Sequence, residues 1–335
     1  MKFSDMSLCK LLNLKMPVFQ APMGGAVTPK FASCIANHGV LAMLPLGNWL
    51  IESCEKLIDE TLALTEHTVG VNLILAWDQK ERLALALKKG IKVIWFFWGD
   101  ASQYIDEIHA HGAKVIVTVG KPDEAKKAVE SGADIIVAQG WEAGGHIWGE
   151  VATLPLIPAV VDVVGDSVPV IAAGGIADGR GMAAALALGA QGIVLGTRLL
   201  ASYEAGIHEQ YKQSILNAKV NDTVFTDLFD KGWPESHMRV LLNSTYNMWL
   251  DANKPAFGER PGKSDIITEF SPDKPVERYS YYLPSPVMKG NLEPLAHYMG
   301  QSVGLIHEQK FVHEILDEVI NDAIKRINQL QQIKV

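Results

Sequence analysis

The residues with the clearest chemical potential form a glycine-rich segment that ends in a histidine. An apolar run is followed by Gln139-Gly140-Trp141-Glu142-Ala143-Gly144-Gly145-His146. An imidazole has an unperturbed pKa of about 6.5, which suits proton transfer near neutral pH. The two glycines before it leave the backbone free to deliver the ring to a ligand. His146 is therefore the candidate catalytic residue, although the spacing alone also fits a structural histidine.

Two further glycine-bearing turns have the composition of a phosphate site. The first reads Ala172-Ala173-Gly174-Gly175-Ile176 and is followed by Asp178, a predicted helix N-cap. The second reads Leu195-Gly196-Thr197-Arg198. Glycine lets backbone N–H groups approach a phosphate, and the dipole of a following helix favours its negative charge. The same glycines could instead only form tight turns.

Three other patterns lead to no site. Gly179–Ala184 matches the G-x-G-x-x-A dinucleotide fingerprint, but the next apolar run, ending at Leu195, offers no acidic residue for a ribose. Gly258–Ser264 resembles a P-loop but is one residue too short and follows no strand. His109 and His111 lie two residues apart, a poor spacing for a metal on a helix, so we predict no metal site.

The elements that must position these residues alternate over the first 200 residues of the chain. Val- and Ile-rich runs alternate with Ala/Lys/Glu stretches of helical spacing, which is typical of βα units with parallel strands. The strand runs are almost continuously apolar, as expected when both faces are buried. We expect eight strands, at 18–21, 40–44, 69–75, 93–98, 115–119, 135–139, 168–172 and 193–195. Helices are expected at 79–89, 102–110, 123–130 and 180–188.

Eight such units favour an α/β fold of the (β/α)₈ TIM barrel type over an open doubly wound sheet. Active sites of these barrels lie at the C-terminal ends of the strands, and phosphate commonly binds after strands 7 and 8. Gly174 and Gly175 follow the seventh expected strand, and Gly196 and Thr197 follow the eighth. We therefore predict that these two turns bind a phosphate group.

The alternation stops after Ser202. Residues 204–291 contain Trp233-Pro234, one helical stretch and a Pro-rich run that can continue neither a helix nor a central strand. From Leu292 the chain is expected to be helical again, ending in an amphipathic helix over 311–329. We predict a barrel formed by 1–203 and 292–335, with 204–291 as a smaller inserted, helical and irregular lid. Trp233 and Tyr279–Tyr282 either cover the barrel mouth, as we predict, or only anchor the insert.

Composition excludes several classes of protein. The chain has 335 residues, of which 48% are hydrophobic and 20% charged, and its net charge of −8 argues against a general nucleic-acid binder. Every long apolar stretch is interrupted before 18 residues and the N-terminus lacks a signal-peptide pattern, so we expect no membrane span and a cytoplasmic location. Three cysteines without a C-x-x-C pair predict no disulfide framework. The oligomeric state stays open, a homodimer included.

Taken together, six motifs resemble the nitronate monooxygenase family, once called 2-nitropropane dioxygenases. In chain order they are Pro17–Gly25, Gly70–Leu73, Gln139–His146, Ala173–Ile176, Leu195–Thr197 and Tyr298–Ser302. The resemblance spans nearly the whole chain. Its glycine–histidine segment is specific to this family and its relatives, the flavin-dependent enoyl-acyl-carrier-protein reductases and NADH:quinone reductases.

The resemblance implies one non-covalently bound FMN. Matching the motifs residue by residue implies cofactor contacts at Met23, Asn72, Gln139, Gly144, Gly174, Gly175, Leu195, Gly196, Thr197 and Gln301. In the family, the residue matched by His146 deprotonates a neutral nitroalkane or contacts the nitro group of a nitronate. The implied function is the oxidation of alkyl nitronates, and of nitroalkanes, with O2.

The chain departs from the family pattern at two places, and these keep the substrate open. Trp141 stands where a small or polar residue is usual, so it could narrow the pocket or stack on a substrate. Ile147-Trp148-Gly149-Glu150 is closer to the reductases than to nitronate oxidisers. The alternatives are an NAD(P)H-dependent flavin reductase acting on an enoyl thioester or a quinone, and a barrel without flavin.

Overall fold

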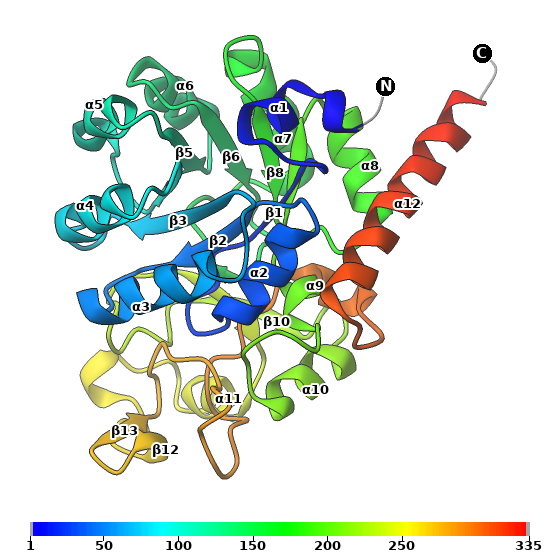
Figure 1. Ribbon diagram of the computed structural model, residues 1–335. Helices are drawn as coiled ribbons and strands as arrows, with labels where there is room; N and C mark the ends of the chain where they lie inside the picture. Colours follow the sequence, from blue (N-terminus) through cyan, green and yellow to red (C-terminus); the bar gives the residue numbers. More distant parts are fainter. Residues whose placement is uncertain (1–2, 333–335) are drawn as a thin grey trace.

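The computed structural model describes residues 3–332 and shows eight parallel strands wound into a barrel, with helices around it (Figure 1). The strands follow one another around the sheet in the order β1-β9-β8-β6-β5-β4-β3-β2. A parallel bridge between Phe19 and Leu41 joins β1 to the start of β2 and closes the ring. The barrel strands are β1 (Val18–Gln20), β2 (Ala42–Pro45), β3 (Val69–Ile74), β4 (Val93–Phe97), β5 (Lys114–Val119), β6 (Ile135–Gln139), β8 (Val170–Ala173) and β9 (Gly192–Leu195).

This architecture confirms the TIM barrel expected from the sequence. Every predicted strand is present, with bounds that differ by no more than two residues. The connecting helices are α2 (Pro29–Asn37), α3 (Ile51–Leu62), α4 (Lys80–Lys88), α5 (Ser102–Ala110), α6 (Pro122–Glu130), α7 (Thr153–Val164), α8 (Gly179–Ala187) and α9 (Thr197–Leu200). At the other end of the chain, α12 (Val312–Gln331) lies against α8, where Gly179 allows the backbone of Ala323 to approach closely (Figure 1).

The core has two layers, because strand side chains alternate between the interior and the helices. In β1, Val18 packs toward the helices whereas Phe19 packs inside the barrel. The interior is filled by large side chains that include Met43, Trp95 and Ile116. The short helices η1 (Phe3–Asp5) and α1 (Ser7–Leu12) precede β1, and α1 places Leu8 against the start of β9. The N-terminal end of the barrel is therefore plugged, and its chemistry belongs to the opposite end.

The insert contains more β-structure than the sequence predicts. Besides α10 (Glu209–Asn217), α11 (Ser244–Asp251) and η2 (Phe257–Glu259), it has β10 (Thr223–Thr226) and β11 (Met238–Leu241), which pair antiparallel, and a hairpin of β12 (Ile266–Ser271) and β13 (Lys274–Glu277). Pro275 lies in β13, a strand with only one neighbour, where a missing N–H is tolerated. In Figure 1 the insert elements gather at one end of the barrel.

The expectation of a helix from Leu292 onward is wrong for 292–300. This segment makes a turn at 293–294 and then runs along the insert sheet: Tyr298 bridges Val240, and the backbone N–H of Leu241 donates to the His297 carbonyl. Its backbone groups serve the edge of the insert sheet and so cannot form a helix. Helix begins only at η3 (Gln301–Leu305) and α12, whose buried face matches the predicted amphipathic pattern. Within residues 3–332 no helix is long and apolar enough to span a membrane.

Candidate active site

The candidate histidine lies on a two-residue strand that joins the barrel to the insert. After β6 the chain turns and forms β7 (Gly145–His146), which pairs antiparallel with β11 of the insert. The side chain of Gln139, the last residue of β6, holds this turn through two hydrogen bonds. Its side-chain amide donates to the His146 carbonyl at 3.1 Å, and its oxygen accepts the Trp148 backbone N–H at 3.0 Å. Gln139 therefore sets the position of His146.

Aromatic rings enclose the imidazole of His146. The Trp233 ring stacks on it at 4.0 Å between centroids, Tyr298 lies at 5.5 Å, and the edge of Trp98 lies at 6.1 Å. Nε2 of His146 is buried and has no hydrogen-bond partner among residues 3–332. Burial lowers the pKa of His146 from 6.5 to about 3, because the charged form loses its hydration. The pKa of His146 therefore lies well below the unperturbed value considered from the sequence, and His146 is a neutral imidazole at pH 7.

The first predicted phosphate turn follows β8 and packs under the β6 loop. Gly174 and Gly175 have φ values of +98° and +71°, which glycine adopts without steric cost. A Cβ at Gly174 would lie 2.9 Å from the Gly140 carbonyl oxygen, so the turn also needs glycine for its packing. The Thr153 hydroxyl donates to the Gly174 carbonyl at 3.0 Å and fixes the turn to the start of α7.

The second turn meets the terminal segment of the chain. The Gly300 backbone N–H donates to the Thr197 hydroxyl oxygen, and the Gln301 N–H donates to the Glu142 carbonyl, both at 3.0 Å. A Cβ at Gly144 would lie 2.4 Å from the Gly300 nitrogen, so the two backbones touch at this point. The structure therefore brings Gly144, Thr197 and Gln301 together from three distant parts of the sequence.

Several backbone donors at these turns are available to an anion. The N–H groups of Gly175, Ile176 and Thr197 have no acceptor within the described part of the chain. At Gly196 an added Cβ would meet only the Ala21 side chain, at 3.5 Å. Unpaired N–H groups beside a helix start, with glycines that keep the backbone accessible, form the kind of cradle that binds phosphate.

The other residues predicted to contact the cofactor are not hydrogen-bonded to this cluster in the described part of the chain. Asn72, at the C-terminal end of β3, is buried and its side-chain amide donates to the Trp95 carbonyl at 2.9 Å. Met23 follows β1 and packs against the helix-facing core. Leu195 points into that core as well, so that only its backbone faces the barrel end. All three lie at the same rim as His146, but no hydrogen bond joins Met23 or Asn72 to the two turns within residues 3–332.

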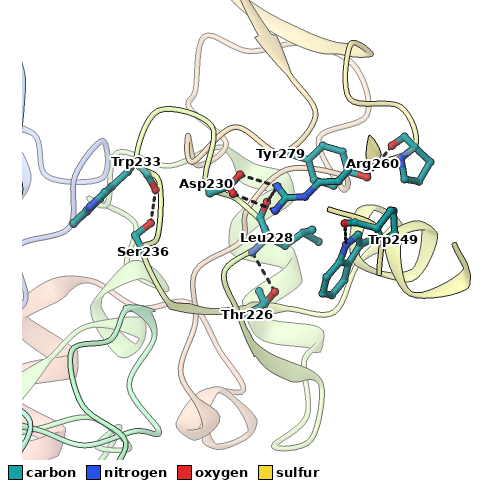
Figure 2. Close-up of polar contacts among 10 residues, drawn as sticks. Thr226, Leu228, Asp230, Trp233, Ser236, Trp249, Arg260 and Tyr279 are labelled. Atoms are coloured by element: carbon teal, nitrogen blue, oxygen red, sulfur yellow. Dashed lines mark hydrogen bonds and ion pairs between the residues drawn. The ribbon is translucent and has the colours of Figure 1, made fainter. Parts of the chain in front are cut away.

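A network of hydrogen bonds holds Trp233 above His146. The Arg260 guanidinium donates to both carboxylate oxygens of Asp230, at 2.7 and 3.1 Å, and to the Leu228 carbonyl at 3.0 Å. The Trp233 backbone N–H donates to the Asp230 carbonyl, and the Ser236 hydroxyl donates to the Trp233 carbonyl at 2.7 Å. Figure 2 shows the Trp233 ring pointing away from this network. These hydrogen bonds hold the base of the loop, and the Trp233 indole projects from it (Figure 2).

Sequence reasoning missed part of this aromatic enclosure. Trp98 and Tyr298 contact His146. In the sequence they were recognised only as the end of an expected strand and the start of a motif, and neither was assigned to the site. The position of Trp98 at the C-terminal end of a barrel strand was the available signal. Trp141, expected near the substrate, instead lies under the Arg239 guanidinium at 4.4 Å and against Phe225 of β10. It packs the β6 loop onto the insert. Among residues 3–332 no cluster of three or more His, Cys, Asp or Glu side chains is placed to hold a metal ion.

An α/β barrel with a buried neutral histidine and an anion cradle at its C-terminal rim has the features of a cofactor-dependent enzyme. The nitronate monooxygenase family model matches residues 64–322. A probable nitronate monooxygenase of Staphylococcus aureus (strain Newman) is 35% identical over 268 residues, which cover 66% of this chain and 75% of that protein. The chain belongs to the nitronate monooxygenase family, and it is a flavin-dependent oxidoreductase.

Other relatives carry different activities in their names. The (3aS,4S,5R,7aS)-5-hydroxy-7a-methyl-1-oxo-octahydro-1H-indene-4-carboxyl-CoA dehydrogenase of Rhodococcus jostii (strain RHA1) is 31% identical, covering 98% of each chain. FabK from Thermotoga maritima superposes with a TM-score of 0.82 at 32% identity, covering 97% of each chain. The nitroalkane oxidase of Streptomyces ansochromogenes gives 0.77 at 25% identity, covering 97% of this chain and 100% of that one.

Proposed function

We propose that the protein is an FMN-dependent oxidoreductase that oxidises alkyl nitronates and nitroalkanes with O2, with His146 as the base. The observation that carries this proposal is the state of His146: a buried Nε2 without a partner, on an imidazole that is neutral at pH 7. A group of this kind can accept a proton from a substrate that enters the aromatic enclosure.

The rim of the barrel fits the cofactor. The turns at Gly174–Gly175 and Gly196–Thr197 would hold the phosphate through unpaired N–H groups. Met23, Asn72, Gln139, Gly144 and Gln301 would line the remainder of the FMN site. When bound, FMN supplies the redox chemistry by accepting the electron pair that the substrate loses.

The chain itself contributes proton transfer and the exclusion of water. A neutral nitroalkane must lose a proton from carbon, and Nε2 of His146 would take it. Burial makes protonated His146 costly by itself, but the nitronate that forms beside it carries a compensating negative charge. Trp233 and Tyr298 keep this ion pair away from water. A nitronate has already lost the proton and needs only to be bound.

Residues 204–291 act in this proposal as the lid and substrate subdomain of the barrel. Their support is contact: Trp233 stacks on His146, and the Tyr281 hydroxyl lies 3.4 Å from Asn48 Oδ1, in the loop after β2. Tyr279 instead serves to anchor the insert, which is the other role considered for Tyr279–Tyr282. It is buried within the insert, and its hydroxyl donates to the Pro261 carbonyl at 2.7 Å.

A second candidate is an NAD(P)H-dependent flavin reductase acting on an enoyl thioester or a quinone. It is favoured by the full-length similarity to a carboxyl-CoA dehydrogenase and to FabK. In this alternative, electrons enter from a nicotinamide, and His146 handles a proton at the acyl chain or quinone instead of a nitroalkane carbon.

An anaerobic reductant panel separates the two candidates. The purified protein should show the absorbance of bound flavin, and acid release followed by chromatography should identify it as FMN. Mixing with ethyl nitronate, nitroethane, NADH or NADPH in separate anaerobic experiments then shows which compound bleaches the flavin. Bleaching by the nitro compounds alone supports the first candidate. Bleaching by NADH or NADPH alone replaces it with the second, and a colourless protein contradicts both.

A further inference from the structure

Trp98 differs from the other rings around His146 in the strain of its backbone. Its φ is +68°, in the left-handed region that bulky L-residues adopt only at an energetic cost. Strain of this kind persists where surrounding contacts hold a residue in place, and it concentrates at sites that switch. Here the contacts that hold it are aromatic: Phe97, Trp148 and Trp233 lie 5.2–5.3 Å from its ring centroid.

The other rings of the enclosure are held by hydrogen bonds or by closer packing than Trp98. The Trp148 indole N–H donates to Glu124 at 2.9 Å, and the Tyr298 hydroxyl donates to the Tyr281 carbonyl at 2.6 Å. Trp233 is 5% exposed, and its ring packs against Trp77 at 4.7 Å and on His146 at 4.0 Å. Within residues 3–332 no acceptor binds the indole N–H of Trp98, and Gly99 and Asp100 after it are exposed. Of these rings, the half-buried Trp98 is therefore the one that can leave without losing a side-chain hydrogen bond or a stacked contact with His146.

Access to His146 requires such a movement. Its Nε2 is buried, so a substrate can reach it only after a neighbouring ring is displaced. Displacing the Trp233 ring would lose its packing against Trp77 and His146, and displacing Tyr298 would break its hydrogen bond to the Tyr281 carbonyl. Displacing Trp98 breaks only ring contacts, and a backbone movement out of the left-handed region would also relieve its strain.

We propose that Trp98 is the movable wall of the substrate site. The part of the substrate that takes its place, next to the reacting carbon at His146, is a neutral, apolar ring about the size of an indole. The vacated space is bordered by Phe97, Trp148 and Trp233, which offer ring faces and edges. Aromatic neighbours of this kind reward another flat apolar group and leave a charge without compensation. This inference rests on the proposed function only in taking His146 as the residue that meets the substrate.

Fluorine NMR of the flavin-loaded protein labelled with 5-fluorotryptophan tests the movement directly. The Trp98 resonance is assigned by its loss in Trp98→Phe, and the Trp249 resonance, from an indole bonded to Pro255 in the insert, serves as the internal control. Unlabelled indole is titrated as the neutral probe, and indole-3-carboxylate as its charged counterpart. We expect indole to shift the Trp98 resonance, to leave that of Trp249 unchanged, and to bind at least ~10-fold more tightly than the carboxylate.

Calorimetry provides a second measurement that does not depend on the label. In Trp98→Ala the probe no longer has to displace a side chain, so indole should bind at least ~10-fold more tightly than to wild type, or about 1.4 kcal/mol. Trp249→Ala should keep the wild-type affinity. An unchanged Trp98 resonance at saturating indole, or equal indole affinity of Trp98→Ala and wild type, overturns the movable wall. Equal affinity for indole and its carboxylate overturns the neutral-ring assignment.

These outcomes are independent of the proposed reaction. If neither nitroethane nor its nitronate is oxidised but the Trp98 resonance still shifts, the proposed function falls and the movable wall stands. If both compounds are oxidised while the resonance stays in place, the reverse holds.

Discussion

The His146 imidazole stacks on the Trp233 indole with 4.0 Å between ring centroids and 28° between ring planes. One ring comes from the loop after barrel strand β6 and the other from the loop between β10 and β11 of the insert. The pairing of β7 with β11 brings these two loops together. The candidate base and the ring that covers it therefore belong to one hydrogen-bonded unit, although 87 positions separate them in the sequence.

Breaking the Asp230–Arg260 ion pair should loosen the Trp233 loop. The Arg260 side chain is 8% exposed and that of Asp230 13% exposed, so Asp230→Asn leaves a mostly buried guanidinium without its counter-charge. Loss of one partner of a buried pair costs about 3 kcal/mol in the free energy of unfolding. Urea unfolding measures it. Glu60→Gln, which removes an exposed pair with Lys56, should cost less than about 0.5 kcal/mol; equal losses in the two variants would contradict the assigned role.

The phosphate turn after β9 offers a clean test of cofactor binding. Gly196→Asp places a carboxylate where an anion is expected, so the flavin-to-protein ratio of the purified variant should fall at least ~10-fold. Gly196→Ala is the matched control, because its Cβ meets only Ala21 at an ordinary 3.5 Å. Circular dichroism shows whether both variants fold. Wild-type flavin content in folded Gly196→Asp would remove this turn from the phosphate site.

Most of the barrel could be predicted from the sequence, because its signals are local. Continuous apolar runs and a regular alternation with helical stretches carry the eight strands, and no long-range information is needed to find them. The secondary structure of the insert was harder to predict. Its strands are four to six residues long, and the Pro-rich composition that argued against a central strand does not exclude a two-stranded hairpin such as that of β13.

The candidate site likewise has a part that could be predicted from the sequence and a part that could not. The glycine turns could be located from composition and strand order, and the structure places them at one rim. The pKa of His146 could not be predicted, because it depends on burial by Trp98, Trp233 and Tyr298, which come from three separate parts of the chain. Residues 292–300 were predicted incorrectly for a related reason: the backbone partners of His297 and Tyr298 lie in β11, more than 50 residues earlier.

His297 should make the protein less stable in acid. It is 2% exposed, its ring nitrogens contact Ser214 and the Leu292 carbonyl, and burial lowers its pKa to about 4. The unfolded chain therefore binds a proton more readily than the folded one, so stability present above pH 6.5 is lost as the pH falls toward 4. Between pH 7 and 5 this one group accounts for about 2 kcal/mol.

Urea unfolding at the two pH values measures that loss. In His297→Gln the drop between pH 7 and 5 should be smaller than in wild type by about 2 kcal/mol. His307→Gln, at an exposed position, should keep the wild-type difference. A drop in His297→Gln as large as in wild type would show that His297 is protonated alike in the folded and unfolded states.

The low pKa of His146 also predicts the pH dependence of the reaction. With a pKa of about 3, His146 is already neutral at pH 5. The pH dependence of kcat/KM for a nitroalkane reports the pKa values of groups in the free enzyme. In initial-rate oxygen-uptake assays, kcat/KM should therefore stay constant from pH 8 down to pH 5. A fall with a midpoint near 6.5 would show instead that His146 titrates as an ordinary, solvated histidine.

The most direct test of the account compares His146→Asn with wild type on a nitroalkane and on its nitronate. Asparagine keeps polarity and approximate size, so flavin content should survive. Removing a positioned base typically costs about 10²–10⁴-fold in rate, and only the substrate that still carries its proton needs the base. We expect kcat/KM on nitroethane to fall by at least ~100-fold while that on ethyl nitronate changes less than ~10-fold. Equal losses on both substrates, with flavin retained, would contradict His146 as the base.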